Sequence, residues 1–199
     1  LVLQEITAPT VSVTPLSATV VAASPVTFTA SANGTTPYSY QWRKGGVAIV
    51  GATLSSLAIS SVQAVDAGSY DVVVTNPVGS GTSNLVALTV NSPVSITTQP
   101  ASLTLNPGSL ATFSVNATGT APISYQWKKN GANIAGGTSA SYSISSVQAL
   151  DAGTYSVDVT NVVGTVSSSP ATLSVNVPVS ITTQPQPLAV NPGTLAAFS

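Results

Sequence analysis

Apolar and polar residues alternate along short stretches of this chain, with a period of two rather than the 3.6 of a helix. Tyr70, Val72 and Val74, for example, alternate with neighbours that include Ser69 and Asp71. Similar stretches are centred near Phe28, Leu57, Val86, Phe113, Tyr142, Val157 and Leu173. Segments rich in Asn, Gly and Pro separate them, and no segment carries a helical stripe of useful length. The pattern predicts an all-β protein built from short strands.

The chain also repeats itself, and the repeat defines its organisation. Tyr40-Gln41-Trp42 returns as Tyr125-Gln126-Trp127, and Asp66-Ala67-Gly68-Ser69-Tyr70 returns as Asp151-Ala152-Gly153-Thr154-Tyr155. Both motifs give an offset of 85 residues, since 127 − 42 and 155 − 70 are equal. A fixed period of this length indicates tandem copies of one small domain. Each copy is predicted to be a β-sandwich of roughly seven strands.

The phase of the repeat predicts four segments. Residues 1–7 match the last strand of a preceding repeat, 8–92 and 93–177 form two full copies, and 178–199 match the first strands of an incomplete third repeat. Two strands without partners bury too little surface to be stable alone. We therefore expect either that the natural chain continues in both directions or that another molecule supplies the missing strands.

The joints between copies are short. Only a few residues, around Pro93 and Pro178, separate the last strand of one copy from the first strand of the next. Proline fixes its own φ and restrains the residue before it, which favours an extended joint. Copies joined in this way are expected to form a semi-rigid rod.

Composition excludes several classes of function. Charged residues make up 5% of the chain and the net charge is −1, whereas a nucleic-acid partner requires a clustered cationic face. The chain has no Cys and no His, which removes disulfides, thiolate chemistry, the usual general base and most zinc sites. Charge-free runs are interrupted too often by Pro, Gly and polar residues to read as membrane helices. We expect no enzyme activity, no cofactor and no membrane insertion of this segment.

The repeated motifs resemble the immunoglobulin fold, specifically its intermediate-set pattern. Trp42 and Trp127 lie where that family places the buried tryptophan of its third strand. The Asp-Ala-Gly-x-Tyr run that ends at Tyr70 and at Tyr155 is similar to the family's signature before the sixth strand. The resemblance implies that these tyrosines form tyrosine corners, whose hydroxyl groups bond back to nearby backbone.

The chain departs from that family at its paired cysteines. They would fall at Ala30 with Val72, and at Val115 with Val157, all of which are small or medium apolar residues. A disulfide closing such a loop stabilises by about 4 kcal/mol in the chain-entropy model, so core packing must replace it. The resemblance to cysteine-free repeats of large bacterial surface or secreted proteins implies an extracellular or cell-surface location.

The acids have a structural interpretation. Asp66 and Asp151 are expected to accept backbone N–H bonds in the turn before the sixth strand. Paired-carboxylate catalysis would need two acids that face one cleft, and calcium binding would need several carboxylates. Each copy has only two acids, and the second acids, Asp71 and Asp158, are not at equivalent positions.

All four cations follow the tryptophans, as Arg43-Lys44 and Lys128-Lys129. One interpretation is a solubilising tip in which one residue of each pair protects a sheet edge. The other is a basic spot, recurring once per domain, that contacts an acidic polysaccharide or a neighbouring chain.

Three functional hypotheses follow. The first is a non-enzymatic structural or adhesive array, a rod or stalk whose partners are neighbouring repeats or another surface protein. The second is an extracellular filament, in which identical chains pair through strands or domains. The third is a carbohydrate-binding accessory module of a secreted enzyme, which requires exposed aromatic side chains; Tyr38 is the best candidate, but Ile123 takes its place in the second copy.

Overall fold

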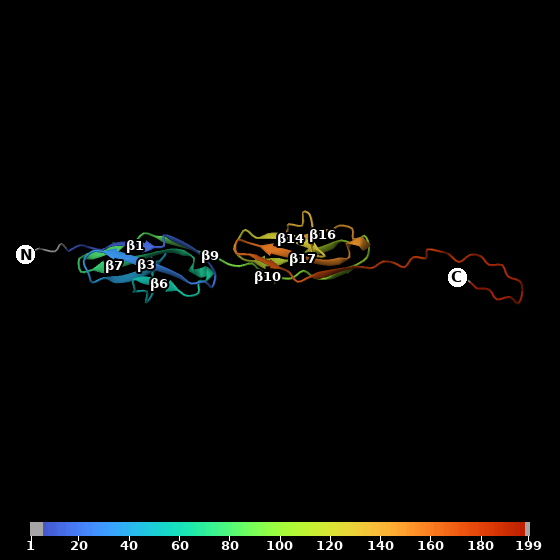
Figure 1. The fold of residues 1–199 in the computed structure, drawn as a ribbon, viewed down its shortest axis with the longest axis horizontal. Coiled ribbons are helices and arrows are strands. Elements are labelled where there is room, and N and C mark those ends of the chain that lie inside the picture. Colours follow the sequence, from blue (N-terminus) through green and yellow to red (C-terminus); the bar gives the residue numbers. More distant parts are fainter. Residues whose placement is uncertain (1–5, 198–199) are drawn as a thin grey trace, which may run out of the picture.

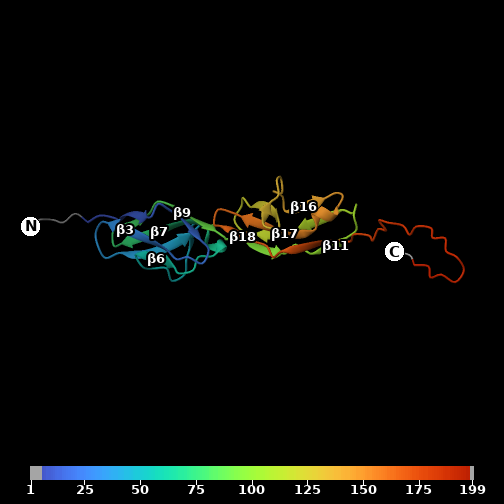
Figure 2. The same ribbon diagram turned by 45° about the vertical axis from the view of Figure 1, so that its right-hand side comes forward.

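The computed structural model describes residues 6–197, and in this range almost all regular structure is β-strand. Two β-sandwiches lie end to end along the long axis of the molecule, and an extended tail follows the second (Figure 1). The same arrangement is seen after a 45° turn (Figure 2). The predicted all-β architecture is confirmed.

Two sheets form the first sandwich. One has the strand order β1-β3-β6, and the other has the order β2-β9-β7-β4-β5, with β8 paired to β7. Neighbouring strands are antiparallel except for β2 and β9, which run parallel. The elements are β1 (Thr10–Thr14), β2 (Ser17–Val21), β3 (Val26–Asn33), β4 (Ser39–Lys44), β5 (Val47–Ala48), β6 (Ser56–Ile59), the 3-10 helix η1 (Ala64–Asp66), β7 (Gly68–Asn76), β8 (Gly79–Thr82) and β9 (Val86–Asn91).

The second sandwich repeats this plan with local differences. Its larger sheet has the order β11-β19-β17-β14-β15, with β18 paired to β17, and β11 and β19 are again parallel. The other layer consists of the pairs β10-β13 and β12-β16. The elements are β10 (Ser95–Thr98), β11 (Leu103–Leu105), β12 (Ala111–Ser114), β13 (Asn116–Thr118), β14 (Ser124–Lys129), β15 (Ala132–Asn133), β16 (Ser141–Ile144), the 3-10 helix η2 (Ala149–Asp151), β17 (Gly153–Thr160), β18 (Thr165–Ser167) and β19 (Ala171–Val175).

Each copy contains more strand segments than the roughly seven predicted, because two strands are divided in both copies and the counterpart of β3 is also divided in the second, into β12 and β13. The first strand crosses from one sheet to the other, which separates β1 from β2 and β10 from β11. The last strand is interrupted at Ser83 and Ser168, whose Oγ atoms accept the backbone N–H of Val72 (3.1 Å) and Val157 (3.0 Å). A side chain therefore replaces one step of the backbone ladder.

Each sandwich encloses its own core, and the two cores are built alike. Trp42, Phe28 and Tyr70 lie together in the first, with ring centroids 6.5 Å apart for Phe28–Trp42 and 5.5 Å for Phe28–Tyr70. In the second, Phe113 and Tyr155 stack with centroids 4.6 Å apart. Every buried member of the first core except Val13 has a buried counterpart at the 85-residue offset.

The two ends of the chain differ from the full copies. The strand expected within residues 1–7 falls mainly on residues 1–5, which lie outside the described part of the chain. Residues 178–197 form no strand and are exposed. Their counterparts β10 and β11 pair with β13 and β19, which follow later in the second copy. Between residues 6 and 197, no helix has the length and apolar character needed to cross a membrane.

Candidate functional site

The two predicted turn-capping acids lie in the short helices η1 and η2. The Asp66 carboxylate accepts the backbone N–H of Gln63 (2.8 Å), and Asp151 accepts that of Gln148 (2.7 Å). In the same turns the hydroxyl of Tyr70 donates to the backbone carbonyl of Asp66 (2.6 Å), and Tyr155 donates to that of Asp151. Acid and tyrosine thus close one turn before β7 and before β17.

Burial changes the acidity of both tyrosines. It raises the pKa of Tyr70, and the nearby Asp66 carboxylate raises it further. Burial, with smaller effects of Asp151 and Tyr142, raises the pKa of Tyr155 to about 12. Both phenols therefore hold their protons as buried hydrogen-bond donors, which suits a structural role and not a nucleophilic one.

The positions expected for a disulfide are packed with aliphatic side chains. Ala30 and Val72 lie in the first core, with exposed fractions of 8% and 0%. Val115 and Val157 occupy the same places in the second core and are also buried. The tryptophans are fully buried, and their indole N–H groups donate to backbone carbonyls of Leu54 and Ser139.

One cation in each copy forms a cross-strand ion pair. Arg43 binds Asp71 with two parallel hydrogen bonds, Nε to Oδ1 (2.8 Å) and Nη2 to Oδ2 (2.6 Å), and Asp71 is buried although the alternation places it on the polar face. Lys128 binds Asp158 (2.6 Å). Hydrogen bonds from Lys128 and then Ser167 hold the pKa of Asp158 below its usual value. The two cations are thus at equivalent positions of the repeat, whereas the two acids that bind them are not.

The remaining two cations cap the neighbouring turn. The ammonium of Lys44 donates to the backbone carbonyl of Val65, and that of Lys129 donates to Leu150. Each also lies over a tyrosine ring, 5.8 Å from the centroid of Tyr70 in the first copy and 6.0 Å from that of Tyr155 in the second. All four cations are engaged within their own domain.

The strand order of the sheets contradicts the interpretation in which one cation of each pair protects a sheet edge. Arg43 and Lys44 pair with β5 on one side of β4 and with β7 on the other, so neither lies at the edge of its sheet. Lys128 and Lys129 are placed in the same way between β15 and β17. The short strands β5 and β15 form the edges instead.

At the joint between the copies, two consecutive residues are hydrogen-bonded to different domains. Asn91 ends β9, and its carbonyl accepts the N–H of Ala22 (2.9 Å) in the first copy. The next residue, Ser92, is held by the second copy: its N–H donates to Thr120 Oγ1 (2.7 Å) and its carbonyl accepts from Thr120 N (3.0 Å) and Asn161 Nδ2 (2.9 Å). One domain therefore passes directly into the next.

We call the contact of Asn161 with Ser92 the asparagine clamp. An equivalent clamp lies at the start of the first copy, where Asn76 Nδ2 donates to the carbonyls of Thr7 (2.7 Å) and Thr35 (2.6 Å). The sequence predicts a short joint from its prolines but does not reveal this clamp. Asn76 and Asn161 are buried polar residues that open the Asn-x-x-Gly turn in both copies. Their recurrence at the 85-residue offset is the sequence signal of this contact, although an Asn-x-x-Gly run by itself indicates only a turn.

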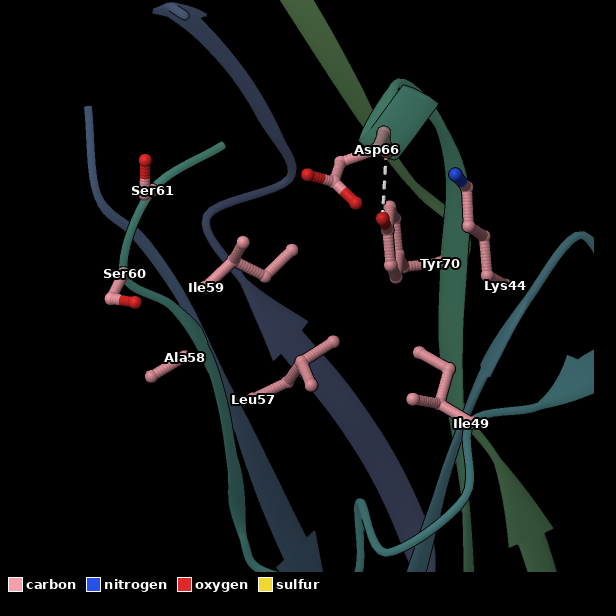
Figure 3. A pocket seen from close by; sticks show the side chains of 9 residues that line it. All are labelled: Lys44, Ile49, Leu57, Ala58, Ile59, Ser60, Ser61, Asp66 and Tyr70. Atoms are coloured by element: carbon pink, nitrogen blue, oxygen red, sulfur yellow. Dashed lines mark hydrogen bonds between the residues drawn. The ribbon is translucent and has the colours of Figure 1, made fainter. Parts of the chain in front are cut away.

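A groove opens between the two sheets of the first copy, beside β6. Its volume is about 440 Å³, and its lining includes Leu57, Ile59, Ile49, Tyr70 and Asp66. Figure 3 shows the aliphatic side chains on its floor and sides, with the carboxylate of Asp66 and the hydroxyl of Tyr70 at one end. We refer to this cavity as the β6 groove.

Two kinds of site are absent from the described residues, a metal cluster and an exposed aromatic face. Between residues 6 and 197, no three Asp, Glu, His or Cys side chains gather closely enough to hold a metal ion. Within that range every aromatic side chain is buried or half-buried, and the hydroxyl of Tyr38 donates to the carbonyl of Gly34 (2.6 Å). The exposed aromatic pair expected of a carbohydrate-binding face is absent from this part of the chain.

Comparisons with solved structures agree on the fold. A three-domain fragment of titin, I67–I69, superposes with a TM-score of 0.64 at 20% identity, over 86% of this chain and 66% of that one. The N-terminal four Ig domains of Dscam1 isoform 6.9 give a TM-score of 0.68 at 28% identity, over 86% of this chain and 47% of that one. Both neighbours consist of tandem Ig domains.

Curated relatives are matched over part of their length. Endoglucanase C of Cellulomonas fimi is 35% identical over 183 residues, which are 86% of this chain and 16% of the relative. The highly immunogenic outer capsid protein of Enterobacteria phage T4 is 32% identical over 200 residues, covering 89% of this chain and 50% of the relative. The chain thus spans half or less of these proteins.

The family model described as "Immunoglobulin domain" matches the chain twice, at residues 8–76 and 93–161. The two matches cover more than half of the chain, and each contains the tryptophan, the tyrosine corner and the joint-clamping asparagine of one copy. The resemblance drawn from the sequence motifs is confirmed. The chain belongs to the immunoglobulin-domain family, of which it carries two tandem copies.

Proposed function

We propose that these two domains act as a semi-rigid, non-enzymatic spacer in an extracellular protein. The observation that carries the proposal is the joint, where Asn91 is bonded to one domain and Ser92 to the next. Rotation about such a joint requires breaking hydrogen bonds in one of the two domains. The end-to-end placement of the sandwiches supports the same role (Figure 1).

The dimensions suit a spacer. The longest strand of the first copy, β7, has nine residues, and a strand advances by about 3.3 Å per residue. With its loops, each copy would add roughly 30–45 Å along the rod. A spacer needs no ligand for this role, because its function is to set the distance between the parts of the protein that it separates.

The relatives support a module within a larger protein. A relative named as an endoglucanase is matched over only 16% of its length, which is consistent with a part that accompanies a catalytic domain. This match favours a second candidate, an accessory module of a secreted enzyme that acts on polysaccharide. We place spacing first, since the aromatic side chains between residues 6 and 197 are buried or half-buried.

Small-angle X-ray scattering of the intact chain tests the proposal. We expect a rod-like pair-distance distribution with a maximum dimension of at least about 60–90 Å, two domains placed end to end. The curve should not change with protein concentration. A compact particle would overturn the spacer, and scattering that grows steeply with concentration would favour a filament of identical chains.

A further inference from the structure

The two copies differ in how they fill the space beside the tyrosine corner. Nine residues line the β6 groove of the first copy. All of them recur unchanged at the 85-residue offset except Leu57 and Ala58, which are replaced by Tyr142 and Ser143. The large difference in side-chain volume is therefore confined to one position, leucine in the first copy and tyrosine in the second.

In the second copy this tyrosine ring packs into the core from β16. The centroid of Tyr142 lies 6.1 Å from that of Tyr155, with the rings 25° from parallel, and 6.3 Å from that of Trp127. Both geometries are typical of favourable aromatic pairs. In the first copy Leu57 leaves the β6 groove open beside Tyr70. The second copy therefore shows which group suits this space: a phenol ring.

An extended polypeptide could deliver such a ring, because β6 is the outer strand of its sheet. Ala30 N–H donates to the Ser55 carbonyl, and Leu57 lies opposite Phe28. Since antiparallel pairs alternate between bonded and non-bonded positions, the backbone groups of Ser56 and Ala58 point outward. A second hollow of about 380 Å³ continues along the same edge. A strand added here would direct alternate side chains into the β6 groove.

The polar end of the groove complements a hydroxyl group. Asp66 Oδ2 accepts the N–H of Gln63, and within residues 6–197 no hydrogen bond reaches Oδ1. The carboxylate lies beside the aliphatic walls formed by Leu57 and Ile59 (Figure 3). A phenol ring could therefore pack on the aliphatic side chains while its hydroxyl donates to Asp66. Two charged residues line the groove, the cation Lys44 and the anion Asp66.

We propose that the β6 groove of the first copy is a docking site for a partner protein that adds an extended strand to β6 and inserts a tyrosine side chain. The partner is not a second copy of residues 6–197, because every aromatic ring in that range is buried or half-buried. We expect the second copy not to use the same mode, because the ring of Tyr142 packs against Tyr155 and Trp127 at the equivalent place. The site is additional to the spacer role and does not depend on it.

The first experiment uses p-cresol, the side-chain analogue of tyrosine, with the ¹⁵N-labelled intact chain in NMR titrations. We expect saturable shifts at Leu57, Ile59 and Tyr70, and none at Tyr142, Ile144 and Tyr155. Leu57→Tyr, which installs the residue of the second copy, should abolish these shifts. The reciprocal Tyr142→Leu should create a responsive groove in the second copy, so the test survives if one variant folds poorly. Equal responses in both copies of the wild type would overturn the proposal.

The second experiment tests strand addition. The probe is a capped heptapeptide of threonine and serine with a central tyrosine, compared with the same peptide carrying alanine at the centre. We expect the tyrosine peptide to bind the wild type at least about tenfold more tightly, since a buried aromatic anchor dominates such contacts. It should also protect the amides of Ser56 and Ala58 from hydrogen exchange. Equal affinities, or binding without this protection, would overturn the docking mode.

Discussion

At the scale of single residues, the tyrosine corner links a local turn to the core. The hydroxyls of Tyr70 and Tyr155 each satisfy a backbone carbonyl at the entrance of the central strand, while their rings complete the aromatic cluster. The same burial that secures these contacts raises the pKa of both phenols. Ionisation is therefore coupled to unfolding.

This coupling predicts a loss of stability at alkaline pH. An unfolded tyrosine ionises near pH 10, whereas folded Tyr155 keeps its proton until about pH 12. A raised folded pKa means that the contribution is intact below the unfolded value and is lost as the pH rises through the folded one. The second domain should thus lose stability between about pH 10 and about pH 12. Tyr155→Phe should weaken this dependence and cost about 0.5–1.5 kcal/mol at neutral pH, the value of the lost hydrogen bond.

Denaturant titrations at several pH values measure the effect, with the Trp127 indole NMR signal as the reporter of the second domain. Tyr70→Phe is the matched control, because it changes the first domain and leaves the Trp127 transition unaltered. Identical pH profiles for the wild type and Tyr155→Phe would show that another group is responsible.

The sequence predicts some residue positions well and others poorly. Alternation and repeat place Trp42, Tyr70 and Val72 on inward-facing positions, because a strand fixes side-chain direction with a period of two. The sequence does not predict the two ion pairs. Asp71 and Asp158 lie at non-equivalent positions, and whether each reaches a cation depends on strand register and side-chain length, which no repeat pattern encodes.

At the scale of elements, the first strand packs differently in the two copies. β1 pairs with β3 over five residues, whereas β10 pairs with β13 through a shifted register. Gly81 on β8 explains part of the difference, because a Cβ there would lie 2.1 Å from the carbonyl oxygen of Pro9, just before β1. The second copy has Val166 at that place. Sequence alone presents Gly81 as one of several turn-associated glycines, so this close approach could not be foreseen.

Gly81→Val is therefore expected to force β1 away from β8. Overpacking of this kind costs about 1–3 kcal/mol, and we expect the first domain to lose that much stability while the second is unchanged. The Trp42 indole signal in denaturant titrations reports the first domain. Val166→Gly is the control, since it removes a side chain from a place with room for it and should cost less than about 1 kcal/mol. Equal losses in the two variants would contradict the close-packing explanation.

At the scale of the whole molecule, the 85-residue period and the prolines indicate tandem sandwiches and a short joint. What the period leaves out is how the joint is held, since that depends on Asn161 and Thr120, which are distant from Ser92 in sequence. Local sequence patterns do not reveal this clamp, because it joins three segments that are far apart in the chain. We therefore expect the stiffness of the proposed spacer to depend on the assembled second domain and not on the joint residues alone.

The clamp yields the last prediction, that Asn161→Ala uncouples the two domains. It removes the donor to the Ser92 and Thr120 carbonyls and the acceptor for the N–H groups of Val163 and Gly164. The second domain should lose about 1–3 kcal/mol, the cost of buried groups left without partners. The released joint should then bend.

Asn76→Ala separates bending from simple destabilisation. It breaks the equivalent clamp on Thr7 in the first domain and leaves Ser92 untouched. Rotational correlation times from ¹⁵N relaxation give the measurement: Asn161→Ala should shorten those of both domains, whereas Asn76→Ala should keep the values of the wild-type rod. If both variants tumble like the wild type, the stiffness resides in the extended backbone around Pro93 and not in the asparagine. If both loosen alike, domain stability and not the joint sets the geometry of the rod.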